Sequence, residues 1–208
     1  MNLELDNLHV LITGGSKGIG LACARGFLAE GARVTLVSRT METLLAAQAA
    51  LTAEFPVAVV TADSATRVNV IAVDLRDAAD AERAVETSER DFGPVDVLVN
   101  SAGAARRTPA AELTAESWHD AMQAKFFTYI NVINPLIKKM GERGRGAVVN
   151  VIGSGGKVAA VTHLAGGSAN AALLLASAGL AAAYAGKGVR VNAVNPGLTL
   201  SERLHEGM

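Results

Sequence analysis

The sequence has little cysteine, few aromatic side chains and no excess of charge of either sign. Among its 208 residues there is one cysteine, aromatic residues make up 4%, and the formal net charge is −1. A single cysteine excludes an internal disulfide, and the place of Cys23 within an apolar helical pattern favours a buried thiol over a reactive one. A chain without excess charge has no broad field to attract nucleic acid or an anionic membrane, so we expect neither as a partner.

The N-terminus also lacks the features of an export signal. In MNLELDNLHVLITGG, acidic residues stand where a signal peptide needs basic ones, and the apolar run is as short as a strand. We therefore expect a cytoplasmic protein. Residues 164–186 carry no charge and approach the ~20 residues of a membrane span. Gly, Ser, Asn and Ala dominate their first half, which favours a helix buried on all sides.

Short β-branched runs alternate with helical patterns along the whole chain. This alternation is typical of βαβ units in a parallel sheet that is covered on both faces. The length suits one domain, and no internal repeat or charged linker divides it. We predict a single doubly wound α/β domain of the Rossmann type over residues 1–208. The expected strands are 8–13, 33–38, 68–73, 95–99, 146–151 and 189–194, and the expected helices are 18–30, 40–54, 77–92, 115–140 and 164–186.

Two details of this pattern are less regular. Glycines at or just beyond the helix ends are expected to stop the helices, at Gly31, Gly93, Gly141 and Gly186. Residues 57–66 contain a surplus Val-rich run between the second helix and the third strand. We predict an inserted loop or a small hairpin there.

A glycine turn follows the first expected strand, in LITGGSKGIG. Gly14, Gly18 and Gly20 permit a sharp turn and a close approach to a pyrophosphate, while amides at the helix N-terminus face that anion. The spacing is G-x3-G-x-G rather than the commoner G-x-G-x-x-G, and a glycine turn alone also occurs for structural reasons. The turn therefore needs support from other positions.

That support comes from the second strand. A dinucleotide site carries at this strand end either an acid for the ribose 2′-hydroxyl or a basic group for a 2′-phosphate. The chain has Ser38 and Arg39 there, and Lys17 lies within the glycine turn. These residues predict NADP rather than NAD as cofactor. The alternative is that Lys17 and Arg39 are two solvated surface cations.

Further polar residues end the third and fourth strands. Asp74 follows the third, and Asn100, Ala102 and Gly103 follow the fourth. Ligands of open α/β sheets bind at this carboxyl edge, so we place these residues at the cofactor. Asn100 could instead be a plain turn residue.

These motifs occur in an order that resembles one known family. TGGSKGIG, VDL, NSAG, a long helix led by Trp118, AVVNV and GVRVNAVNPG resemble the short-chain dehydrogenases/reductases over almost the whole chain. The resemblance implies an oxidoreductase that moves a hydride between NAD(P) and a carbonyl or alcohol carbon of a small-molecule substrate. It also implies a lid and a final strand beyond Gly197, but the sequence given ends at Met208. Either these two elements lie outside the sequence given, or the substrate site is incomplete. The cofactor positions are Gly14, Ser16, Lys17, Gly18, Ile19, Gly20, Ser38, Arg39, Asp74, Leu75, Asn100, Ala102, Gly103, Pro196, Gly197 and Leu198.

The family's reactive residues are missing. Hydride transfer to a carbonyl requires a proton for the developing alkoxide, and the nicotinamide does not provide it. The family uses a Tyr and a Lys four residues apart, a Ser and an Asn. By alignment of the motifs, these positions read Gly166, Asn170, Gly153 and Lys125, and no Tyr of the chain has a Lys four residues later. The usual mechanism cannot be carried over.

Three residues could replace the missing groups. His163 precedes the helix that would carry the Tyr, and imidazole titrates near neutral pH. Lys125 could present its amine to the pocket, and Ser154 could turn inward in place of Gly153. Two of them have a plainer alternative: His163 could be a helix cap or a surface residue, and Lys125 could be a solvated lysine. We expect no metal site.

Two functions remain open from the sequence. One is an NADP-dependent oxidoreductase with a rewired reaction centre. The other is a catalytically silent nucleotide-binding protein that acts through cofactor-dependent assembly or partner binding. Apolar residues spread around the helices 115–140 and 164–186, at Phe126, Phe127, Ile130 and Ile133 in the first, predict a homodimer or homotetramer that packs through both helices.

Overall fold

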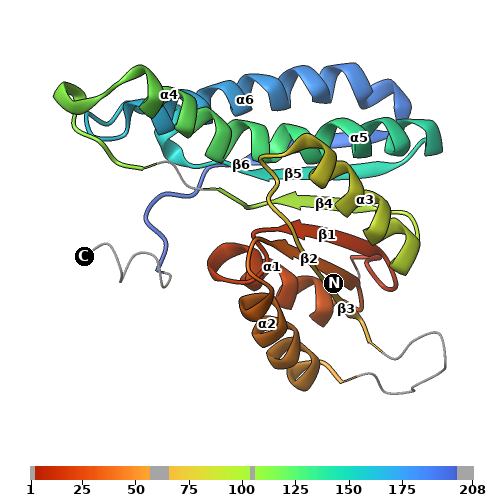
Figure 1. Cartoon of the computed structure of the whole chain (residues 1–208). Helices are drawn as coiled ribbons and strands as arrows, with labels where there is room; N and C mark the ends of the chain where they lie inside the picture. The colour runs from red at the N-terminus through yellow and green to blue at the C-terminus, as the bar shows by residue number, and fades with distance from the viewer. Residues whose placement is uncertain (1–2, 57–65, 104–105, 201–208) are drawn as a thin grey trace.

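The computed structural model describes residues 3–56, 66–103 and 106–200 (Figure 1). Six parallel strands form one sheet in the order β3-β2-β1-β4-β5-β6. The strands are β1 (His9–Thr13), β2 (Arg33–Ser38), β3 (Val68–Ala72), β4 (Val97–Asn100), β5 (Gly146–Val151) and β6 (Val189–Val194). This is the predicted doubly wound Rossmann sheet. Of the insertion predicted at 57–66, only Thr66 belongs to the described residues.

Helices cover both faces of the sheet. On one face, α1 (Gly18–Ala29) and α2 (Met41–Glu54) pack Ala24, Leu28 and Leu44 against β1 and β2. On the other face, α3 (Ala78–Phe92), α5 (Thr128–Arg143) and α6 (Leu164–Tyr184) form the larger core, as Figure 1 shows. The strands read as nearly continuous Val, Leu and Ile runs because both of their faces are buried. The short helices η1 (Ala110–Glu112), η3 (Ser154–Gly156) and η4 (Ala185–Lys187) lie in the connections.

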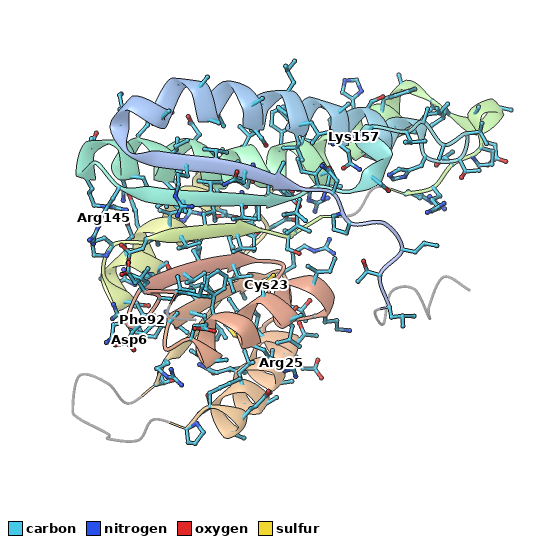
Figure 2. All side chains as sticks on the ribbon, turned by 180° about the vertical axis from the view of Figure 1, so that it is seen from behind. Asp6, Cys23, Arg25, Phe92, Arg145 and Lys157 are labelled. Carbon is cyan, nitrogen blue, oxygen red and sulfur yellow. The ribbon has the colours of Figure 1, made fainter. Side chains whose placement is uncertain are left out.

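The sheet has two distinct edges. Figure 2 shows Arg145 and Phe92, which precede β5 and the loop into β4, at the amino end, and Lys157 at the opposite, carboxyl end.

Cys23 lies in α1 and is half-buried rather than fully buried, and burial raises the pKa of its thiol. A raised pKa leaves little thiolate at neutral pH, in accord with an unreactive cysteine.

The helix predicted at 115–140 is divided into three segments. It begins with α4 (Ala115–Ala121), capped by the Thr114 hydroxyl on the Ser117 amide, and passes through a π-helix, η2 (Met122–Phe127), into α5. It also extends beyond the predicted end to Arg143, where Gly144 (φ 73°) caps it in the left-handed conformation. The prediction of Gly141 as the stop was therefore wrong. A π-helix has no simple signature in hydrophobic periodicity, so this one could not be predicted from the sequence.

The prediction that α6 is buried on all sides was wrong. Its inner face buries Ala169, Asn170 and Leu173, whereas Leu175 on the outer face is 77% exposed. Leu164–Lys187 is long and apolar enough to cross a membrane, with a mean hydropathy of 1.4 in its most apolar window. A core helix of a soluble protein passes the same test, and α6 packs against β6 and η3. The outer face remains apolar and uncovered in the single chain.

Candidate functional site

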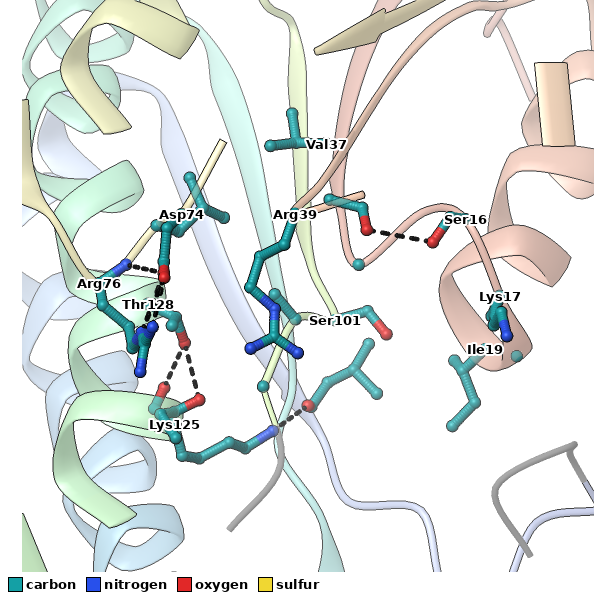
Figure 3. A pocket seen from close by; sticks show the side chains of 18 of the residues that line it. Ser16, Lys17, Ile19, Val37, Arg39, Asp74, Arg76, Ser101, Lys125 and Thr128 are labelled. Carbon is teal, nitrogen blue, oxygen red and sulfur yellow. Dashed lines mark hydrogen bonds and ion pairs between the residues drawn. The ribbon is translucent and has the colours of Figure 1, made fainter. Parts of the chain in front are cut away.

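A cavity of about 640 Å³ opens at the carboxyl edge of the sheet (Figure 3). The segments that follow all six strands meet there, as expected for an open α/β sheet. Its wall brings together most of the predicted cofactor residues: Gly14, Ser16, Lys17, Gly18, Ile19, Ser38, Arg39, Asp74, Leu75, Ala102, Gly103, Pro196 and Gly197. Lys125 lines the same cavity. Three predicted cofactor residues, Gly20, Asn100 and Leu198, do not belong to the wall.

Glycine is required where the turn after β1 lies against its neighbours. Gly14 (φ 66°) and Gly18 (φ 54°) adopt the left-handed region. A Cβ on Gly14 would lie 2.8 Å from the Ser101 carbonyl oxygen. A Cβ on Gly20 would lie 2.3 Å from the Gly14 carbonyl oxygen, so Gly20 serves the packing of α1 on the turn rather than the wall itself. Together they leave the N-terminal amides of α1 directed at the cavity, where a pyrophosphate fits.

One end of the cavity is basic. Lys17 stands at the N-cap of α1, and the Arg39 side chain extends across the cavity in Figure 3. Between them the Ser16 hydroxyl donates to the Ser38 hydroxyl, at 3.2 Å. Two cations and two hydroxyls at the end of β2 suit a ribose 2′-phosphate, and no carboxylate stands at the position that would contact a 2′-hydroxyl.

Asp74 is held by a residue that the sequence analysis did not single out. The Arg76 guanidinium donates to both Asp74 carboxylate oxygens: Nε lies 3.0 Å from Oδ1 and 2.9 Å from Oδ2, and Nη2 lies 2.5 Å from Oδ2. These hydrogen bonds, with smaller help from Arg39, hold the pKa of Asp74 below its usual range. Arg76 also lines the cavity. The DLRD sequence places this arginine two residues after Asp74, but only the folded turn shows that it faces the site.

A chain of buried side-chain hydrogen bonds fixes the strand ends beneath the cavity. The Thr13 hydroxyl donates to Asn100, Asn100 donates to Asn150, and Asn150 donates to Ser177 of α6, at 3.2, 3.0 and 2.9 Å. The backbone amides of Ser101 and Ala102 donate to the Thr13 hydroxyl. Asn100 is therefore neither a wall residue nor a plain turn residue. It braces the loop that carries the wall.

Lys125 lies in the π-helix and lines the cavity, although its side chain is almost completely buried. It is 8% exposed, and its Nζ donates to the Tyr129 hydroxyl at 2.8 Å and to the Val151 carbonyl oxygen at 3.1 Å. The Tyr129 hydroxyl in turn donates to Val151 at 2.5 Å. The alternative of a solvated lysine does not hold. Sequence reasoning missed Tyr129 because it searched for a Lys after a Tyr, and here the Lys precedes the Tyr by four residues.

The other family positions meet near a second glycine-rich turn, residues 153–156, which follows β5. Gly153 (φ 126°) begins the turn, and a Cβ on it would lie 3.4 Å from Asn170 Nδ2. Gly155 packs against the His163 ring, 3.0 Å from its Cδ2 to a Cβ placed on the glycine. Positions that carry a Ser and a Lys in the family thus lie together here with no ionisable side chain.

His163 and Ser154 are close to the site but not part of its wall. Burial lowers the pKa of His163, and the charges of Arg107 and Lys125 lower it further. Its Nδ1 is buried without a hydrogen-bond partner among the described residues. Ser154 is exposed at the start of η3. Lys125 is therefore the one of the three predicted catalytic residues that lines the cavity, and the catalytic roles of all three stay predictions.

The fold and the cavity define a class, a dinucleotide-binding protein of the Rossmann type. Comparison with known proteins is more specific: the family model described as short chain dehydrogenase matches residues 8–207. The chain belongs to the short-chain dehydrogenase/reductase family of oxidoreductases. Of the curated relatives, it is 33% identical over 205 residues to a D-threitol dehydrogenase of Mycolicibacterium smegmatis, covering 99% of this chain and 75% of the relative.

Two solved structures are similar over nearly the whole chain. The first is L-sorbose reductase of Gluconobacter frateurii, complexed with NADPH and L-sorbose, with a TM-score of 0.90, 30% identity and coverage of 100% of this chain and 75% of that one. The second is an NADPH-bound short chain oxidoreductase of Pseudomonas aeruginosa that contains an atypical catalytic center, with a TM-score of 0.88, 32% identity and coverage of 97% and 77%. Among the described residues of this chain, no cluster of three or more His, Cys, Asp or Glu side chains could hold a metal ion.

Proposed function

We propose that the protein is an NADP(H)-dependent oxidoreductase that moves a hydride to or from the carbonyl or alcohol carbon of a small-molecule substrate. One observation carries the proposal: a single cavity connects the glycine turn and the basic pair Lys17 and Arg39 to the buried ammonium group of Lys125. We also propose that residues 1–208 act as one domain in the cytoplasm.

The residues present fit the cofactor along its whole length. The amides at the start of α1 would hold the pyrophosphate, and Lys17 and Arg39 the 2′-phosphate. Asp74 and Leu75 would lie at the adenine, and Pro196 and Gly197 would border the nicotinamide. The NADPH-bound state of both similar structures supports NADP over NAD.

The chain itself must then orient the substrate and manage a proton. The cofactor, when bound, supplies the hydride. Lys125, which lines the cavity, would donate a hydrogen bond to the carbonyl oxygen of the substrate and give that oxygen a proton. His163, whose pKa is lowered, and Ser154 remain candidates. A movement of the turn at residues 153–156 would have to bring them to the substrate.

Polyols and ketoses are the first substrates to test. The relatives named above act on D-threitol and bind L-sorbose, respectively. Substrate identity also depends on surfaces that close over the cavity, so the test panel should extend to keto acids and simple ketones.

The experiment follows NADPH oxidation with this panel for the wild type, Lys125→Met and the matched control Lys138→Met, an exposed lysine of α5. We expect turnover in the wild type and control, and a loss of 10²-fold or more in Lys125→Met, in the range of general acid catalysis. Equal turnover by Lys125→Met would move the reaction centre to another residue. A wild type that binds NADPH but reduces no compound would contradict the proposal.

That last outcome describes the second candidate, a catalytically silent nucleotide-binding protein. The observation that favours it is the absence of an ionisable side chain at Gly153, Gly166 and Asn170, three positions that carry the family's chemistry. Such a protein would act through assembly or partner binding when the cofactor is bound. A Gly166→Tyr/Asn170→Lys variant that gains activity absent from the wild type would favour this candidate.

A further inference from the structure

We propose that Tyr129 is a positioning residue for Lys125, and that this buried pair delivers the proton in place of the family's missing acid. The inference deepens the proposed function, on which its catalytic part rests. Lys125 is the catalytic residue of the pair because it lines the cavity, and Tyr129 acts through it because its side chain is completely buried.

The geometry of the pair is closed and specific. Both side chains point at one backbone acceptor, the Val151 carbonyl oxygen, at 3.1 Å from Lys125 Nζ and 2.5 Å from the Tyr129 hydroxyl. Nζ also donates to the Tyr129 hydroxyl at 2.8 Å and lies 4.5 Å from the centre of its ring. Since the phenolic proton is given to Val151, the phenolic oxygen is left to accept from the ammonium.

The backbone around the pair supports a fixed position. Lys125 belongs to the π-helix η2 and Tyr129 to the first turn of α5, so the four-residue spacing puts both on the inner face. The Thr128 hydroxyl donates to the Lys125 carbonyl oxygen at 2.9 Å and holds the widened turn. Val151 is the last residue of β5, two residues before Gly153. Three elements therefore converge on the ammonium group.

Such an arrangement is costly for a lysine that serves packing alone. A buried ammonium loses its hydration, and its partners must replace it. A leucine or methionine would fill the same volume without that cost. The charge is kept at the wall of the cofactor cavity, where a developing alkoxide would benefit from it.

The proposed step balances as follows. The carbonyl carbon receives the hydride with its electron pair, and the π pair of the C=O bond moves to the oxygen. A proton leaves Lys125 Nζ and forms the O–H bond of the product alcohol. The neutral amine stays in the position that Tyr129 and Val151 define, and it regains a proton from bulk water. In the direction of alcohol oxidation, the neutral amine accepts the proton.

The charged and titratable groups that face Lys125 determine its pH dependence. Tyr129 faces it from α5, and His163 faces it from the N-terminus of α6, where the Lys125 charge lowers the pKa of His163. From the loop after β2, Arg39 lines the same cavity as Lys125. Loss of the Tyr129 hydroxyl removes an acceptor of the ammonium, which makes the charged form less favourable.

The test is a titration of the Lys125 amine by NMR of the full-length protein with isotopically labelled lysine, and Lys125→Met assigns the signal. The variants are Tyr129→Phe, which keeps the ring, and the control Tyr184→Phe, whose ring lies beside another lysine, Lys187. We expect the titration midpoint of Lys125 to fall by about one pH unit in Tyr129→Phe and to stay unchanged in Tyr184→Phe. An unchanged midpoint in Tyr129→Phe would overturn the proposal.

Kinetics separate this inference from the proposed function. The alkaline limb of the kcat profile for carbonyl reduction should move with the midpoint in Tyr129→Phe, while KM for NADPH stays as in the wild type. A limb that stays in place while the midpoint moves refutes the role in proton delivery. A shifted midpoint in a protein that reduces no carbonyl compound leaves Tyr129 as the positioning residue but contradicts the proposed function. If Tyr129→Phe does not fold, 3-fluorotyrosine at position 129 keeps the shape, and an unchanged midpoint there overturns the proposal equally.

Discussion

Arg39 is the residue on which the choice between the two nicotinamide cofactors depends. It follows β2 and lines the cavity beside Ser38 and Thr40. A charge-assisted contact with a 2′-phosphate contributes roughly 1.5–3 kcal/mol, so Arg39→Asp should weaken NADPH binding about tenfold or more. NADH lacks the phosphate, and its affinity should change little. Fluorescence titration of both cofactors, with the exposed Lys138→Asp as control, measures the effect. Equal wild-type affinity for NADPH and NADH would refute this assignment.

His9 predicts how stability depends on pH. It is completely buried, with Nδ1 2.8 Å from the Gly93 carbonyl oxygen and Nε2 2.9 Å from the Thr35 hydroxyl. Burial, the largest cause, lowers the pKa of His9 below 6.5. The unfolded chain therefore binds a proton before the folded chain does. The stability that comes from keeping His9 neutral in the folded chain is fully present above about pH 6.5, and it is lost as the pH falls below that value.

The measurement is the unfolding temperature between about pH 5 and pH 8. His9→Gln should flatten the fall in stability on the acid side, whereas His119→Gln, at an exposed histidine of α4, should leave it as in the wild type. An acid-side slope that is the same in wild type and His9→Gln would show that His9 does not titrate in this range.

At the residue scale, the cofactor end could be predicted from the sequence and the reaction centre only in part. Gly14, Lys17 and Arg39 follow strands that the hydrophobic pattern already locates, so their place at the carboxyl edge is a local consequence. The Lys125–Tyr129 pair depends on a π-helix and on the carbonyl of β5, which lies 26 residues after Lys125. No local pattern brings those three groups together. The role of Arg76 was missed for the same reason, since it depends on a turn.

Two glycines of α6 provide a matched pair at the scale of the element. A Cβ on Gly167 would lie 2.8 Å from the Gly155 carbonyl oxygen, whereas a Cβ on Gly179 meets nothing within 4 Å. Gly179→Ala should stabilise the protein by roughly 0.5–1 kcal/mol because alanine favours the helix. Gly167→Ala gains the same propensity but forces α6 away from η3, and should destabilise the protein by about 1–3 kcal/mol.

Urea unfolding of both variants tests this packing. The expected signs are opposite, so a common error in helix propensity cannot produce the result. Stabilisation of similar size in both variants would mean that η3 does not press on the start of α6. The closeness of that contact also explains the glycine at position 167, which lets α6 lie on the backbone of η3.

At this scale the strands and helices were predicted closely because the chain alternates cleanly between two periodicities. Each of the six strands was found within about two residues of its predicted ends, which is the usual error of such boundaries. The division of 115–140 into α4, η2 and α5 was not predicted, since Pro135 and the periodicity are compatible with one continuous helix. Apolar composition alone also overstated the burial of α6, because composition does not say which face meets the sheet.

For the whole molecule, the exposed apolar surface predicts self-association. Leu175 is 77% exposed on α6, and Phe127, at the end of η2, is 38% exposed. The segment 115–140 exposes less apolar surface than the sequence indicated, since Ile133 is in the core and Phe126 and Ile130 pack against it. We expect a homodimer or homotetramer that covers the outer face of α6, and Leu175→Glu should shift it toward the monomer.

Light scattering at micromolar concentration measures this directly. Leu45→Glu, at a leucine of α2 that is 50% exposed, is the control and should leave the assembly unchanged. A monodisperse wild-type monomer would refute the prediction.

The central claim is that this chain transfers a hydride although three of the family's four reactive positions carry no ionisable group. The most direct test uses NADPH deuterated at C4, in both stereoisomers, with the carbonyl panel and mass spectrometry of the products. We expect deuterium from one stereoisomer to appear on the carbinol carbon in the same amount as NADPH is consumed, and Lys125→Met to lower this transfer by 10²-fold or more. Bound NADPH with no deuterium in any product would contradict it.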